Sequence, residues 1–200
     1  MKTATRSYHQ GARAESAEAT GRRIIEAFLA RLMDQWFDEI TLDRVAEDAG
    51  VTVQTVVRRF GGKEGLLASA VTIFAERVRA QRAAPPGDFD RLVENLLADY
   101  EKTGDAVMRL LALEQRHPTL EPVLELGRGE HRQWVSSGFA ALLRGLEPPV
   151  RQRALDALVI VTDVYTWKLL RRDLGRSVRE TSATLKNLIQ AIIAQTSTTQ

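Results

Sequence analysis

The side chains with the clearest chemistry lie in one short segment. When residues 52–60 are drawn as a helix, one side is polar and consists of Gln54, Thr55, Arg58 and Arg59. Amide and hydroxyl groups bond the edges of bases, and guanidinium groups bond bases or phosphates. This combination on one face is typical of a helix that enters the major groove of DNA.

The same segment has the composition of a β-strand, because β-branched residues dominate positions 51–57. A helix is nevertheless the better interpretation. Its second side collects the apolar residues at helical spacing, namely Val53, Val56, Val57 and Phe60. A strand would divide these valines between two faces and would have no neighbour with which to pair. Thr52 is also well placed to cap the N-terminus of the helix.

Another short helix is predicted directly before this one. Residues 42–49 carry an apolar face, Thr41 suits the N-cap position, and Gly50 suits the left-handed turn that ends a helix. Two short helices joined by a tight turn form a helix-turn-helix, here residues 41–60. Apolar stripes predict a longer helix before the motif, up to Phe37, and a fourth helix after it.

Positive charge is concentrated in two places, although the net charge is only +2. Residues 1–23 hold five Lys/Arg and two Glu (+3), residues 24–50 hold two Arg and seven Asp/Glu (−5), and residues 51–63 hold three basic residues and no acid (+3). The two basic clusters either arise by chance on a solvent-exposed surface or contact nucleic acid. Lys63 falls in the first turn of the fourth helix, where the helix dipole disfavours a cation. It is therefore expected either to share a bound phosphate or to extend into solvent.

Neither an enzyme nor a metal site is predicted. The chain has no cysteine, which excludes disulfides and thiolate metal sites, and its only histidines are His9, His117 and His131. Glu114 and His117 have a spacing found in carboxylate-bridged metal sites, but the motif does not occur a second time. No catalytic triad order, phosphate-binding loop or dinucleotide fingerprint is present.

The chain as a whole is expected to be all-α, with about nine helices. Residues 1–17 are expected to form a disordered basic arm, and the Pro-Gly-rich break after residue 82 separates an N-terminal domain (18–82) from a helical domain (88–200). The expected helices after the break include 89–97, 107–113 and 119–145, then 149–173 and 177–196. No signal peptide or membrane-spanning run is apparent, so a cytoplasmic protein without a membrane partner is expected.

The C-terminal half offers candidates for a ligand pocket. The expected helix at 149–173 is apolar nearly all round and therefore needs burial on more than one side. Asp163 within it should either pair with an arginine such as Arg132 or Arg153, or serve as a polar handle for a ligand. The residues that form either a pocket or ordinary core are Met108, Trp134, Phe139, Thr162, Asp163, Tyr165 and Trp167.

The segment "IIEAFLARLMDQWFDEITLDRVAEDAGVTVQTVVRRFGGKEGLL" resembles the DNA-binding domain of TetR-type transcriptional regulators, and the resemblance spans residues 18–78. It implies an N-terminal three-helix helix-turn-helix domain followed by a divergent helical domain that binds an inducer and dimerises. It further implies a homodimer formed through the helices at 149–173 and 177–196.

The resemblance also assigns individual residues. It implies that Thr41 touches phosphate, and that the residues facing or reaching DNA are Thr52, Val53, Gln54, Thr55, Arg58, Arg59 and Lys63. Two departures stand out. Val57 replaces a tyrosine that commonly contacts phosphate, so the affinity for DNA is expected to depend more on Arg58, Arg59, Arg22 and Arg23. The resemblance also turns Val57 toward DNA, whereas the helical wheel turns it inward. A Gly-Gly pair at 61–62 removes a side-chain cap from the fourth helix.

The function expected from these features is repression of transcription. A homodimer would bind a palindromic operator in double-stranded DNA and would be released by a small-molecule inducer, with no cofactor. The alternative is a helical small-molecule-binding protein whose helix-turn-helix does not bind DNA. A helical enzyme is a third hypothesis, which turnover of a ligand would identify.

Overall fold

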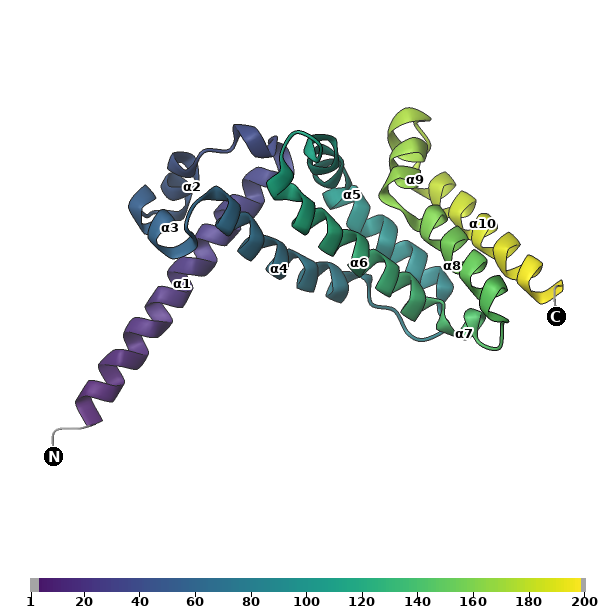
Figure 1. Cartoon of the computed structure of the whole chain (residues 1–200), viewed down its shortest axis with the longest axis horizontal. Helices are drawn as coiled ribbons and strands as arrows, with labels where there is room; N and C mark the ends of the chain where they lie inside the picture. The colour runs from purple at the N-terminus through teal and green to yellow at the C-terminus, as the bar shows by residue number, and fades with distance from the viewer. Residues whose placement is uncertain (1–3, 199–200) are drawn as a thin grey trace. The chain divides into compact units, whose positions relative to one another are not determined.

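The computed structural model describes residues 4–198, with side chains for residues 15–195. Every regular element among the described residues is a helix (Figure 1), which confirms the all-α prediction. The chain divides into two compact units, residues 1–73 and residues 74–200.

Unit 1 (residues 1–73) is built on a long first helix. Its elements are α1 (Ala4–Asp34), the 3-10 turn η1 (Phe37–Glu39), α2 (Leu42–Ala49), α3 (Val53–Phe60) and the start of α4 (Lys63–Arg82). The predicted apolar stripe is buried, with Ile24 and Phe28 fully covered, and Val45, Val56 and Leu66 complete the core.

The first helix begins far earlier than expected. Residues 4–17 continue α1 where the sequence predicted a disordered arm, and residues 1–3 lie outside the described residues. The physical reason is composition, because the segment is rich in helix-forming Ala, Arg, Gln and Glu and contains no proline.

Unit 2 (residues 74–200) begins within α4, and its other elements pack around a single core. These are α5 (Phe89–Leu113), η2 (Pro118–Leu120), α6 (Glu121–Gly138), α7 (Ala140–Leu143), α8 (Pro148–Thr162), α9 (Val164–Lys168), the π-helical turn η3 (Leu169–Asp173) and α10 (Val178–Thr198). Within this unit, α10 lies alongside α8, and α9 packs on α5 (Figure 1).

The break at 83–88 is a loop inside unit 2 and not the division between the units. The C-terminal end of α4 is fixed in unit 2 by Arg82, which is only 8% exposed. Its guanidinium pairs with Asp99 of α5 at 2.6 Å and lies 4.6 Å from the ring centre of Tyr100. Its backbone oxygen accepts a hydrogen bond from the Trp134 indole of α6 at 3.3 Å.

Two predicted helix boundaries also differ. The expected helices 89–97 and 107–113 are one helix, α5, which runs through Gly104. A Cβ at Gly104 would lie 2.4 Å from the buried Trp167 ring, so glycine serves packing here and not a break. Conversely, the expected helix 149–173 is interrupted at Asp163, whose carboxylate accepts from the Tyr165 amide at 2.9 Å and caps α9.

A bilayer-spanning segment would need a long apolar helix, and none of the helices in the described ranges meets both conditions.

Candidate nucleic-acid interface

The helix-turn-helix is held by the caps that the sequence predicted. The Thr41 hydroxyl accepts from the Arg44 amide at 3.4 Å at the start of α2, and Gly50 ends that helix in the left-handed region at φ 63°. The Thr52 hydroxyl accepts from the Thr55 amide at 3.3 Å at the start of α3. These local bonds fix where both short helices begin, and so fix which face α3 presents.

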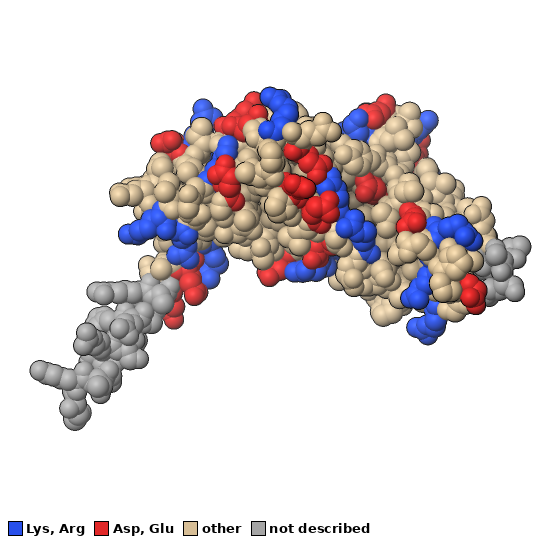
Figure 2. All heavy atoms as spheres, in the orientation of Figure 1, with Lys and Arg blue, Asp and Glu red and all other residues tan. Residues whose placement is uncertain are grey.

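That exposed face of α3 carries the predicted polar set. Gln54, Arg58 and Arg59 are exposed, while Val53 and Thr55 are half-buried. Thr52 is exposed, although its hydroxyl is already bonded to that of Thr55 at 3.0 Å. Lys and Arg side chains gather at the edge of unit 1 where α3 meets α1 (Figure 2).

Val57 also faces outward, with 42% of its surface exposed, whereas Val56 is completely buried. The helical wheel placed Val57 on the packing side, and the resemblance placed it toward DNA. The structure turns Val57 outward, away from the packing side, because Val56 is the side chain of α3 that is fully buried. Val57 therefore adds an apolar group to a polar surface.

Lys63 has neither of the environments considered from the sequence. Its ammonium donates to three backbone carbonyls around η1, those of Phe37 at 2.8 Å, Ile40 at 3.0 Å and Asp38 at 3.4 Å. Burial lowers the pKa of Lys63 below its ordinary value, and the charge of Glu64 opposes that shift. The backbone around η1 therefore holds the Lys63 ammonium in this structure.

Replacing Lys63 by methionine should destabilise the protein by roughly 1–3 kcal/mol, because charge-assisted bonds to partly buried carbonyls are lost. Urea denaturation of the variant measures this cost. The salt slope of DNA binding should stay unchanged; a slope reduced by about 0.9 would instead mean that Lys63 neutralises a phosphate.

The seven predicted pocket residues differ widely in exposure. Phe139 and Trp167 are fully buried core residues, Tyr165 is 56% exposed, and Met108 is half-buried. Asp163 acts as a helix cap rather than pairing with Arg132 or Arg153. Trp134 meets Phe139 edge-on, with ring centres 6.3 Å apart, and Met108 packs against the same core. Trp134 and Thr162 lie on either side of a residue that the pocket prediction did not include.

That residue is His131 of α6, which is 9% exposed and stacks on Trp134 at 5.7 Å. The Thr162 hydroxyl donates to the Leu158 carbonyl at 2.7 Å, so it must accept from His131 Nε2 at 3.2 Å. His131 Nδ1 is then a buried acceptor with no partner among the described residues. The sequence signal was available, because His131 lies seven residues after the buried Leu124 on the apolar stripe of α6.

Burial, reinforced by the charge of Arg82, lowers the pKa of His131 to about 4 from the ordinary 6.5, although Asp163 opposes the shift. Above pH 6.5 the imidazole is neutral in both folded and unfolded chains. Between pH 6.5 and 4 the His131 imidazole is protonated in the unfolded chain but stays neutral in the folded chain. The free energy of unfolding should therefore fall as the pH falls. Denaturation in buffers across this range tests the prediction: His131→Gln should flatten the decline, and a decline as steep as that of the wild type would contradict it.

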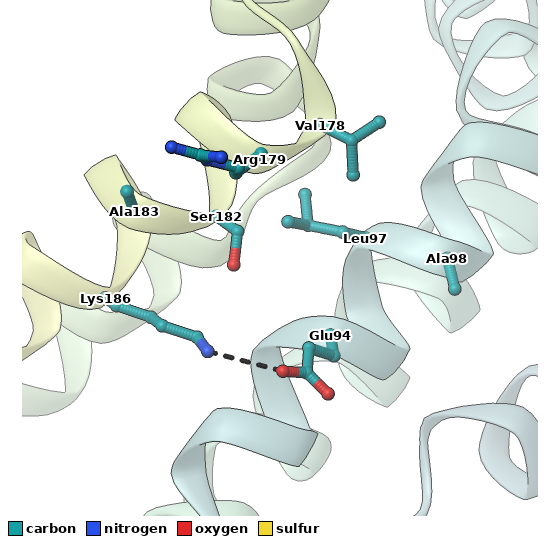
Figure 3. A pocket seen from close by; sticks show the side chains of 8 residues that line it. All are labelled: Glu94, Leu97, Ala98, Val178, Arg179, Ser182, Ala183 and Lys186. Carbon is teal, nitrogen blue, oxygen red and sulfur yellow. Dashed lines mark hydrogen bonds and ion pairs between the residues drawn. The ribbon is translucent and has the colours of Figure 1, made fainter.

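A surface groove of about 580 Å³ lies elsewhere in unit 2, between α5 and α10 (Figure 3). Leu97 and Ala98 of α5 line one side, and Ser182 and Ala183 of α10 line the other. Lys186 crosses the groove toward Glu94 at 3.4 Å and bonds Asp90 at 2.7 Å. None of the seven predicted pocket residues lines this groove.

The comparisons with known proteins agree with this geometry. The sequence model of a family described as bacterial regulatory proteins, tetR family, matches residues 24–70. An uncharacterised HTH-type transcriptional regulator of Mycobacterium bovis is 29% identical over 72% of this chain and 76% of the relative. The HTH-type transcriptional repressor SCO4008 of Streptomyces coelicolor is 27% identical over 78% of this chain and 82% of the relative.

Among solved structures, a transcriptional regulator from Rhodococcus sp. Rha1 superposes with a TM-score of 0.67. The sequence identity is 15%, over 88% of this chain and 96% of that one, so this likeness shows a shared fold.

Proposed function

We propose that this chain, which belongs to the TetR family and is a DNA-binding transcriptional regulator, represses transcription by binding a palindromic operator as a homodimer. The observation that carries the proposal is the exposed polar face of α3, capped at Thr52 and bearing Gln54, Arg58 and Arg59. Two copies of α3 would enter major grooves about one helical turn (~34 Å) apart.

Each side chain has a separate task in the proposed complex. Thr41 and Thr52, at helix N-termini, lie at positions suited to phosphate. Val53, Gln54 and Thr55 face the bases of the groove, and Arg58 and Arg59 reach bases or phosphates. Val57 cannot donate a hydrogen bond, so phosphate affinity depends more on Arg22, Arg23 and the two arginines of α3.

Exposed apolar side chains on the last helices support the homodimer. Six large ones, each at least 42% exposed, lie on α8, α9, η3, α10 and the turn between η3 and α10: Ile160, Tyr165, Leu169, Leu174, Val178 and Leu188. A monomer rarely leaves such groups uncovered on neighbouring elements. A second copy packed on α8 and α10 would cover them. The mass of the protein in solution, measured by light scattering, should be twice that of one chain.

The same proposal includes a small-molecule inducer that binds unit 2 and favours a dimer with the wrong spacing for the operator. A preference of about 10⁴-fold for that conformation would carry the switch nearly to completion. The buried polar group of His131 and Thr162 supports a ligand site near the break between α8 and α9. A regulator of this kind acts where the DNA is, in the cytoplasm.

The experiment is a selection of binding sites from random duplex DNA, followed by titration of the recovered duplex at two salt concentrations. A palindrome whose half-sites lie about one turn apart, bound with a steep salt dependence, is the expected result. Recovery of no consensus would contradict the proposal. It would favour instead a small-molecule-binding protein in which the helix-turn-helix serves only packing.

A further inference from the structure

Gly21 of α1 is buried, and the side chain that covers it comes from the end of α3. A Cβ built on Gly21 would lie 2.3 Å from Arg59 Nε and 2.4 Å from Arg59 Nη2, closer than these atoms can approach. The guanidinium of Arg59 therefore rests directly on the α1 backbone. Only glycine leaves this position open.

Glycine inside a helix costs about 1 kcal/mol relative to alanine, so its presence here has an energetic cost. Gly127 and Gly129 of α6 are the useful comparison, because a Cβ built on either meets nothing within 4 Å. Gly21 differs from them by its contact with Arg59. Its lack of a side chain makes room for one particular cation.

The contact leaves the donors of Arg59 unused. Within the part of the chain that the structure describes, the Arg59 guanidinium has no carboxylate partner, and its ring contact is with Phe60 at 5.9 Å. On α1, Arg22 lies 3.8 Å from Glu18 with both side chains largely exposed, and Arg23 donates to the Ala49 carbonyl at 3.4 Å. Arg59 is thus held in place by packing while its N–H groups stay available to an external acceptor.

We propose that Gly21 is a positioning residue for DNA binding, which holds the Arg59 guanidinium ready for a phosphate beside the groove that α3 enters. An arginine side chain loses roughly 2 kcal/mol of rotamer entropy when it is fixed. Because packing on the α1 backbone at Gly21 restricts Arg59 before binding, less of that cost falls on the binding step. The inference rests on the proposed function and extends the interface to a residue of α1.

Gly21→Ala separates this role from a structural one. The added methyl meets the far end of a flexible side chain, so Arg59 should swing away while the fold is retained, and α1 should gain helix propensity. We expect an unchanged or higher melting temperature, together with a roughly 3- to 10-fold loss of affinity for the selected operator duplex. Gly127→Ala, the same exchange at an open helical site, is the matched control and should leave the affinity unchanged.

A double-mutant cycle with Arg59→Ala identifies the partner. Arg59→Ala alone should reduce the salt slope by about 0.9, the loss of one phosphate contact. In that background Gly21→Ala should have no further effect on affinity. An equal loss in both backgrounds, no loss in the wild-type background, or an unchanged salt slope for Arg59→Ala would each overturn the inference. Failure of the wild-type protein to select any operator is a different result, which contradicts the proposed function itself.

Discussion

Replacing Asp99 by alanine should destabilise the protein by about 3–5 kcal/mol, the usual cost of leaving one partner of a buried ion pair without the other. Asp99 is 2% exposed, and both Nε and Nη2 of Arg82 bond its Oδ2, at 2.7 and 2.6 Å. The variant would leave the Arg82 charge buried among Tyr100 and Trp134. Urea denaturation of the two proteins measures the difference in unfolding free energy.

An exposed ion pair of the same kind provides the control. Arg172 bonds Asp105 at 2.8 Å, with 34% and 52% of the two side chains exposed. Asp105→Ala should cost no more than about 1 kcal/mol, because solvent screens the pair. Restoring neutrality in the core with the double change Asp99→Ala and Arg82→Met should recover much of the loss. Equal costs for Asp99→Ala and Asp105→Ala would show that the Arg82 pair does not anchor the end of α4.

Replacing Arg58 by alanine should weaken binding to the selected operator by roughly 5- to 150-fold, or about 1–3 kcal/mol. Arg58 is exposed at the C-terminal end of α3, beyond the buried Val56, so its removal should leave the fold intact. Fluorescence anisotropy with labelled duplex measures the affinity, and the melting temperature reports on the fold.

Arg144→Ala removes another exposed arginine far along the chain, after α7, and should change neither quantity. If Arg58 reads a base, the affinity ratio between operator and scrambled duplex should fall in its variant. If it meets only phosphate, both affinities should fall together. An unchanged affinity for the operator would contradict the assignment of this face of α3.

The helix-turn-helix could be predicted from the sequence because local interactions define it. The hydroxyls of Thr41 and Thr52 bond amides three residues away, and Gly50 takes the one backbone conformation that other residues avoid. Such features depend on the neighbouring residues alone. The apolar stripe of α1 could be predicted in the same way, because its spacing follows the helical repeat.

Features that depend on distant residues could not be predicted in this way. The partners of Lys63 lie 23 to 26 residues earlier in the chain, and Arg82 meets Asp99 only after the chain turns through a loop. The sequence predicted separate helices at 89–97 and 107–113, but Gly104 between them makes room for Trp167, 63 positions later. Asp163 is the exception, because aspartate is a preferred N-cap residue and could have located the start of α9.

The most direct test of the central claim compares the selected palindrome with the same duplex in which one half-site is scrambled. Two chains should bind each palindrome, and scrambling should reduce the affinity by at least about tenfold, because several matched base pairs are lost at once. Gly127→Ala protein should behave as the wild type does, and Arg58→Ala protein should discriminate less between the two duplexes. Equal affinity for both duplexes, with one chain bound to each, would contradict a dimer that reads its operator through two copies of α3.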